Sequence, residues 1–172
     1  MSRAFVRESD DRPEPPIARP GSALPPGAKN YFTPGGASRL REDLRRLVEK
    51  ERPALLARSP DPEAKRRLLI LDQHIQQLEE SLLSAEVVTP PAASARGVVR
   101  FGATVTVRHS DGEEDVYRIV GVDEIDLERS WVSWASPIAK ALLNANLGER
   151  VRFKFPSGEE ELEIVKIEYE EL

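Results

Sequence analysis

The chain has 172 residues, of which 40% are hydrophobic and 32% charged, and its formal net charge is −5 at pH 7. This composition is typical of a folded protein with a heavily charged surface. The absence of cysteine excludes disulfides, thiolate metal sites and a cysteine nucleophile. No apolar run approaches the roughly 20 residues that span a bilayer, and the first residues lack the apolar core of a signal peptide, so we predict a cytoplasmic protein without membrane contact.

Charge is unevenly distributed along the chain. Residues 1–33 and 34–96 each carry +1, whereas residues 97–172 carry −7, with 9 basic against 16 acidic side chains. An acidic C-terminal part disfavours direct contact with nucleic acid phosphates, and it suits either a basic protein partner or a merely solvated surface. Any contact with DNA or RNA is therefore expected to be indirect.

Residues 1–32 are expected to form a proline-rich tail without regular structure. Six of the fourteen prolines fall within residues 1–30, where no periodic apolar pattern is present. Phe5 and Val6 precede an acidic cluster at residues 8–11, and together they could form a short docking peptide. An unstructured terminus is the simpler interpretation of the same residues.

Residues 33–87 predict an antiparallel helical hairpin with coiled-coil spacing. Thr33 followed by Pro34 is typical of an N-cap and a first helical position. Apolar residues recur at steps of three and four on both sides of a proline-marked turn, so each helix has one stripe that the other can bury. Pro53 is expected to kink the first helix or end it early. The stripe residues are Leu40, Leu44, Leu47, Ala54 or Leu55, then Leu68, Leu71, Ile75, Leu78, Leu82 and Ala85.

A linker at residues 88–96 is expected to precede an α+β domain at residues 97–172. Alternating apolar residues, an Asp111-Gly112 turn and a second turn at residues 156–158 predict two hairpins in an antiparallel sheet. Ser136-Pro137 repeats the cap-plus-proline signal before a short helix. About five strands should cover this helix. The residues expected in the core are Phe101, Trp131, Phe153 and Ile164.

Few residues in the chain are suited to chemistry of their own. His74 and His109 lack partners at metal-ligand spacing, so we predict no metal, no cofactor and no self-contained active site. Asp61 and Glu63, at the turn of the hairpin, could reach a metal ion in another protein's cavity. Residues 58–67 are net +2, however, and Asp61 also suits an N-cap before Pro62. Both roles stay open for these two carboxylates.

Several motifs in fixed order carry a family resemblance over roughly residues 30–172. They are NYFTPGGASRLREDL, ERP, VRFGATVTV, RIVGVDEID, SPIAKALLNANLGERV and the closing KIEY. With these motifs the chain resembles the Gre-type bacterial transcription elongation factors, GreA and GreB, and their shorter-armed relatives, including the regulator of nucleoside diphosphate kinase.

The resemblance implies a coiled-coil arm and an FKBP-like C-terminal domain that binds bacterial RNA polymerase beside its secondary channel. It assigns a polymerase-binding role to Ser136, Pro137 and Ile138, which equally suit a helix start and a core position. Transcript-cleavage members carry a longer tip loop with an Asp and a Glu-Asn that help to position a catalytic Mg²⁺, and this chain lacks that loop. An acidic residue that often precedes the Ser-Pro pair is Ala135 here.

Three functional hypotheses follow. The first is a regulator of transcription elongation that binds RNA polymerase, is not itself an enzyme and does not strongly stimulate transcript cleavage. The second is a weak cleavage factor that uses the tip carboxylates Asp61 and Glu63. The third is a peptidyl-prolyl isomerase, which would need an aromatic-lined apolar cleft and rests on analogy of fold alone.

Overall fold

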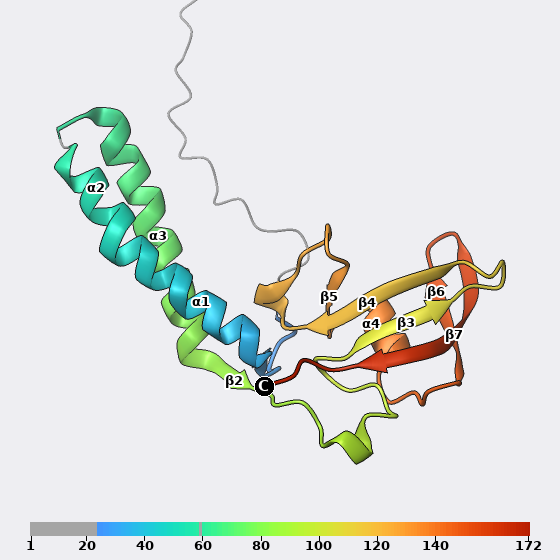
Figure 1. Cartoon of the computed structure of the whole chain (residues 1–172). Helices are drawn as coiled ribbons and strands as arrows, with labels where there is room; N and C mark the ends of the chain where they lie inside the picture. The colour runs from blue at the N-terminus through green and yellow to red at the C-terminus, as the bar shows by residue number, and fades with distance from the viewer. Residues whose placement is uncertain (1–23, 59) are drawn as a thin grey trace, which may run out of the picture.

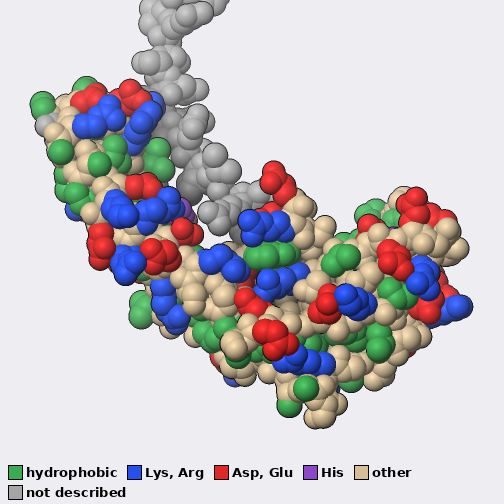
Figure 2. Space-filling view, viewed as in Figure 1, with side chains coloured by type: hydrophobic (Ala, Val, Ile, Leu, Met, Phe, Trp, Pro, Cys, Tyr) green, Lys and Arg blue, Asp and Glu red, His purple; other side chains and the backbone are tan. Residues whose placement is uncertain are grey.

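The computed structural model describes residues 24–58 and 60–172, so the predicted docking peptide at residues 5–11 lies outside the described residues. A helical hairpin joins a β-sheet domain at one end and stands away from it as an arm (Figure 1). The predicted combination of a helical N-terminal region with a β-rich domain is therefore confirmed at this level. The finer coiled-coil and FKBP-like assignments stay predictions. On the face in Figure 2, acidic and basic side chains are interspersed along both parts.

The arm buries its two apolar stripes against each other. Leu47, Leu71 and Ile75 are buried at the centre of the seam, and Leu44, Leu55 and Leu78 pack around them. Each helix starts with a side-chain cap, from Thr33 in the first helix and from Asp61 in the second. The elements are α1 (Pro34–Arg46), the π-helical η1 (Leu47–Glu51), α2 (Arg52–Ala57) and α3 (Pro62–Ser84).

The first helix passes through Pro53 by widening one turn. The Arg52 N–H donates to the Leu47 carbonyl, five residues back, in the π-helical segment η1. Proline has no N–H and crowds the carbonyl four residues before it, and a π-turn absorbs both effects with one extra residue. Of the two alternatives predicted at Pro53, a kink or an early end, the early end is wrong, since helical structure continues to Ala57.

A two-stranded parallel sheet lies at the base of the arm. Strand β1 (Asn30–Phe32) pairs with β2 (Ala85–Val87), which directly follows α3. The irregular tail was expected to include residue 32, and the second helix to reach about residue 86, so both boundaries differ from prediction. Strands of three residues are too short to show a period in the sequence, so the pairing that buries Phe32 could not be predicted from the pattern of apolar residues.

The C-terminal sheet has five strands in the order β5-β4-β3-β7-β6. Neighbouring strands are antiparallel except β4 and β5, which pair in parallel. The prediction of an antiparallel sheet is therefore wrong at one edge, where the loop after β4 carries the chain back to Arg118 and β5 then runs alongside the last three residues of β4. The strands are β3 (Thr104–Arg108), β4 (Glu114–Val120), β5 (Trp131–Ser133), β6 (Arg150–Phe155) and β7 (Gly158–Glu168), with α4 (Pro137–Leu142) and the 3₁₀ turns η2 (Ala93–Ala95) and η3 (Val122–Glu124).

Aliphatic rather than aromatic side chains form the core of this domain. Of the four predicted core residues only Ile164 is fully buried, while Phe101 and Phe153 pack at its margin and Trp131 is half-buried outside it. Phe101 precedes β3, whereas Phe153 and Trp131 lie on the two edge strands β6 and β5, where a side chain has a neighbouring strand on one side only. The fully buried side chains include Val99, Val105, Val107, Ile119, Leu142 and Leu162.

One buried carboxylate joins the arm to the sheet domain. Glu124, in η3, accepts the Thr33 N–H at 3.0 Å and the Gly121 N–H at 2.9 Å, and the Thr33 hydroxyl also donates to it. Thr33 in turn accepts the Gly36 N–H at 3.0 Å as the cap of α1. The start of the arm is thereby hydrogen-bonded to a turn about ninety residues later, and only 3% of the Glu124 side chain is exposed.

We expect Gly36→Ala to destabilise the protein by about 2 kcal/mol or more, because overpacking a buried contact costs this much. A Cβ at Gly36 would lie 1.6 Å from Glu124 Oε1. Alanine is otherwise more favourable than glycine in a helix by about 1 kcal/mol, so a loss of stability would be due to the clash with Glu124. Urea unfolding measures the effect, and Gly97→Ala is the matched control because nothing lies within 4 Å of its Cβ position. An unchanged midpoint for Gly36→Ala would contradict this joint.

Candidate functional site

The tip of the arm is the first candidate site, and its two carboxylates are already engaged. Asp61 accepts the Glu63 N–H at 3.1 Å as the N-cap of α3 and pairs with Arg58 at 3.2 Å. Glu63 pairs with Arg67 at 2.7 Å. Lys65 and Arg66 are exposed on the same turn. Of the described residues, no group of three or more His, Asp or Glu side chains could hold a metal ion.

The second candidate is the segment from Ser136 to Ile138, between β5 and α4. Ser136 is the N-cap of α4 and accepts the Ala139 N–H at 3.3 Å. Pro137 is exposed at the first helical position, and Ile138 is partly buried against the core. The structural roles expected for all three residues are therefore present. Only the Pro137 ring is largely free for a partner.

An arginine cluster surrounds Trp131 where the arm meets the sheet domain. The guanidinium of Arg118, on β4, lies 4.6 Å from the ring centroid, and those of Arg39 and Arg129 lie at 5.0 and 5.3 Å. Arg39 comes from α1, so this stacking adds a cation–π contact to the joint. Glu170 pairs with Arg118 at 3.1 Å and balances part of the charge. These residues were missed as a group because they lie on separate elements.

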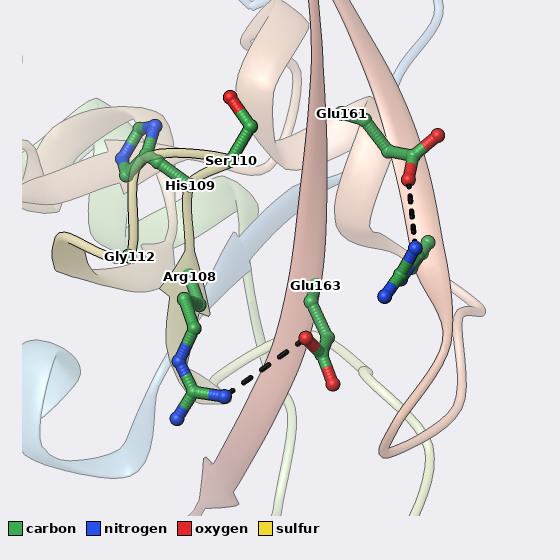
Figure 3. Close-up of a pocket in the computed structure, with 7 residues that line it drawn as sticks. Arg108, His109, Ser110, Gly112, Glu161 and Glu163 are labelled. Carbon is green, nitrogen blue, oxygen red and sulfur yellow. Dashed lines mark hydrogen bonds and ion pairs between the residues drawn. The ribbon is translucent and has the colours of Figure 1, made fainter.

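A cleft of about 330 Å³ lies between the β3–β4 turn and strands β6 and β7 (Figure 3). Arg108 lies 3.9 Å from Glu163, and Arg150 lies 3.4 Å from Glu161, so each guanidinium faces a carboxylate. His109 and Ser110 belong to the β3–β4 turn, with no aromatic side chain in the lining. The cleft is polar and nearly balanced in charge, and it lacks the apolar aromatic walls that a prolyl isomerase would need.

His109 is held between two carboxylates. Nε2 lies 2.7 Å from Asp115, and Nδ1 contacts Glu160 on the neighbouring hairpin. Both ring nitrogens can donate only in the imidazolium, so hydrogen bonds to Glu160 and Asp115 raise the pKa of His109. The sequence analysis considered His109 only as a metal ligand and found no partner for it. In the structure His109 instead bridges Asp115 and Glu160 through two ion pairs.

Comparisons with known proteins identify the family to which this sequence belongs. The family model described as "Transcription elongation factor, GreA/GreB, C-term" matches residues 93–169. Transcription elongation factor GreB of Neisseria meningitidis is 40% identical over 154 residues, which cover 82% of this chain and 94% of that protein. GreA of Alkalilimnicola ehrlichii is 38% identical over 156 residues, covering 83% and 99%. Among solved structures, a GreA/GreB factor from Nitrosomonas europaea is 24% identical with a TM-score of 0.41, covering 83% of this chain and 99% of that one.

The family model and the two curated relatives identify the class of protein as the transcription elongation factors. The chain belongs to the GreA/GreB family. The resemblance predicted from its motifs is thus confirmed. None of the helices in the described part of the chain combines the length and apolarity needed to cross a membrane.

We expect His109 to stabilise the fold most strongly at mildly acidic pH. The pKa of His109 is raised in the folded state, so its contribution is complete below the unfolded value of about 6.5 and is lost as pH rises through the folded value. Urea unfolding at pH 6 and pH 9 should therefore show a larger difference between wild type and His109→Gln at pH 6. His74→Gln is the control, since no ion pair of His74 occurs among the described residues. A pH-independent difference would refute the ion-pair bridge.

Proposed function

We propose that this protein is a non-catalytic regulator of transcription elongation that binds bacterial RNA polymerase at its secondary channel without strongly stimulating transcript cleavage. The proposal follows from membership of the GreA/GreB family, whose named members are transcription elongation factors. Such a partner would place the protein in the cytoplasm. The acidic C-terminal part supports a protein partner over direct contact with nucleic acid.

The observation that carries the proposal is the state of the tip carboxylates. A carboxylate that helps to hold Mg²⁺ needs free oxygen lone pairs and a site that favours positive charge. Asp61 is the cap of α3 and pairs with Arg58, while Glu63 pairs with Arg67. Capture of a cation would have to displace two guanidinium groups in a segment that is already net +2. The tip is therefore a poor metal ligand.

The arm itself supports an occluding rather than a chemical role. Its second helix, α3, has 23 residues, which at 1.5 Å per residue makes a rod of about 35 Å. Arg52 on α2 pairs with Asp72 on α3 at 2.8 Å and ties the two helices together near the distal half. A rod of this length and width can fill a channel without donating a ligand to the metal ion inside it.

Docking is assigned to the segment around Pro137, which presents an exposed ring at the start of α4. Ser136 fixes the backbone there by capping the helix, so the proline is held in one orientation. Ala135 takes the place of an acidic residue, which removes a charge that could pair with a basic partner. Apolar contact is then the main attraction left to this segment.

We expect Pro137→Ser to weaken polymerase binding about tenfold, corresponding to one lost apolar anchor. Competition of the purified protein with a Gre factor for bacterial RNA polymerase measures this affinity. Pro156→Ser is the matched control, because Pro156 is also exposed but lies in the β6–β7 turn. Wild-type protein that does not compete at all would overturn the proposed partner, and equal losses in both variants would reject the docking segment.

We expect wild type and Asp61→Asn to give the same background level of RNA shortening on backtracked polymerase. Asp61→Asn should keep polymerase affinity, because the substitution removes charge at the tip and leaves the docking segment intact. Its unfolding free energy should fall by less than about 1 kcal/mol, since asparagine is also a good N-cap. Strong shortening with wild type that disappears in Asp61→Asn would instead favour the cleavage-factor hypothesis.

A further inference from the structure

The arm has an open apolar groove on one flank. A volume of about 570 Å³ lies between the first helix of the arm and α3, close to the distal half. Its floor is formed by Leu47, Leu55 and Leu71, and Ile70 beside them is 61% exposed. Two helices can bury only the seam between them, so apolar side chains at the edge of the seam remain in water unless another segment covers them.

The lining of this groove has a small excess of positive charge. Arg46 and Arg67 line it beside the neutral His74, with Glu51 as the single acidic lining residue. Both arginines already form ion pairs, Arg46 with Asp43 and Glu51 and Arg67 with Glu63, so apolar contact is the main attraction that the groove offers. A groove on the other flank of the arm is smaller, at about 310 Å³, and its lining has two arginines balanced by two glutamates. The two flanks therefore differ in both size and charge, and the larger one suits an apolar segment that also carries acidic side chains.

We propose that residues 5–11 of this chain, Phe-Val-Arg-Glu-Ser-Asp-Asp, bind in the larger groove. Phe5 and Val6 match its apolar floor. The acidic cluster that follows matches the arginines of the rim, and Arg7 can face Glu51. The sequence and the groove are complementary in composition and in charge.

The position where the described chain begins supports binding within one molecule. Leu24 and Ser81 of α3 line the same pocket at the base of the arm. Ser81, His74 and Arg67 are spaced by seven residues, which is nearly two helical turns, so all three lie on the same face of α3. The chain therefore leaves the arm on the face on which the larger groove opens.

The length of the intervening segment is also sufficient. Residues 12–23 can span about 36 Å at roughly 3 Å per residue, as proline-rich segments do. The distance along α3 from Ser81 is about 10 Å to His74 and about 21 Å to Arg67, at 1.5 Å per residue. A tether of this kind gives an effective concentration in the millimolar range, so even a weak contact would be populated.

Cysteine pairs test the proposal directly, because the natural chain contains none. In the full chain, Ala4→Cys is combined with His74→Cys at the proposed groove or with Glu79→Cys at the opposite one. Glu79 is nearer to Ser81 along α3 but lies on the opposite flank, so the aspartate variant described next is needed to separate binding in the groove from a preference of the tether for one face. We expect the intramolecular disulfide with position 74 to form about tenfold faster in a glutathione buffer.

A third protein combines Ala4→Cys and His74→Cys with Phe5→Asp and Val6→Asp. We expect its intramolecular disulfide to form only as fast as the one between positions 4 and 79. Equal rates for positions 74 and 79, or no effect of the aspartates, would overturn the proposal. If disulfide-linked dimers become the main product as protein concentration rises, the groove would instead bind residues 5–11 of a second copy of the chain. Circular dichroism melting checks folding, and Arg67→Cys replaces His74→Cys if that variant melts early.

Discussion

The Glu124 carboxylate is the interaction on which the relation between arm and sheet domain depends. It binds two backbone N–H groups and the hydroxyl that caps α1, so the direction of the arm is set where its first helix begins. The close approach requires residues without a Cβ: one at Gly36 would meet Glu124, and one at Gly121 would lie 2.0 Å from the Tyr31 carbonyl oxygen. A buried carboxylate is costly unless its lone pairs are filled, and this site fills them with donors from both parts. Loss of any donor would therefore weaken the joint as a whole.

The same chemistry explains why the tip differs from a metal site although it contains carboxylates. A helix N-terminus has free N–H groups, and a short turn leaves few residues to satisfy them. Asp61 is used in this way, with Pro62 filling the position where no N–H is needed. In a turn this short the cap and a metal ligand would compete for one side chain. The paired arginines then make the capped state the favourable one.

Local signals in the sequence predicted most of the fold, and contacts between distant residues account for what was missed. A cap residue directly before a proline predicts a helix start, as at Thr33-Pro34 and Ser136-Pro137. Both caps are present in the structure. The apolar stripes of the arm were also predicted from a local signal, the recurrence of apolar residues at steps of three and four. Glu124 gave no such signal, since its partners lie about ninety residues away, and a lone Glu in a loop usually faces solvent. The cluster around Trp131 was also missed, because its three arginines come from a helix, a strand and a loop.

The arm follows from a limit on what two helices can bury. One seam of leucines holds them together, yet Leu69, Ile70 and Leu83 remain 64%, 61% and 88% exposed. A compact domain would cover these residues with a third element, whereas an arm of two helices leaves them in water. The arm therefore buries less apolar surface, and besides the leucine seam its helices are linked by the ion pair between Arg52 and Asp72 and anchored at the base by the hydrogen bonds of Glu124. The exposed flanks are then the surfaces on which the arm can be recognised, either by a partner or by the chain's own N-terminal residues.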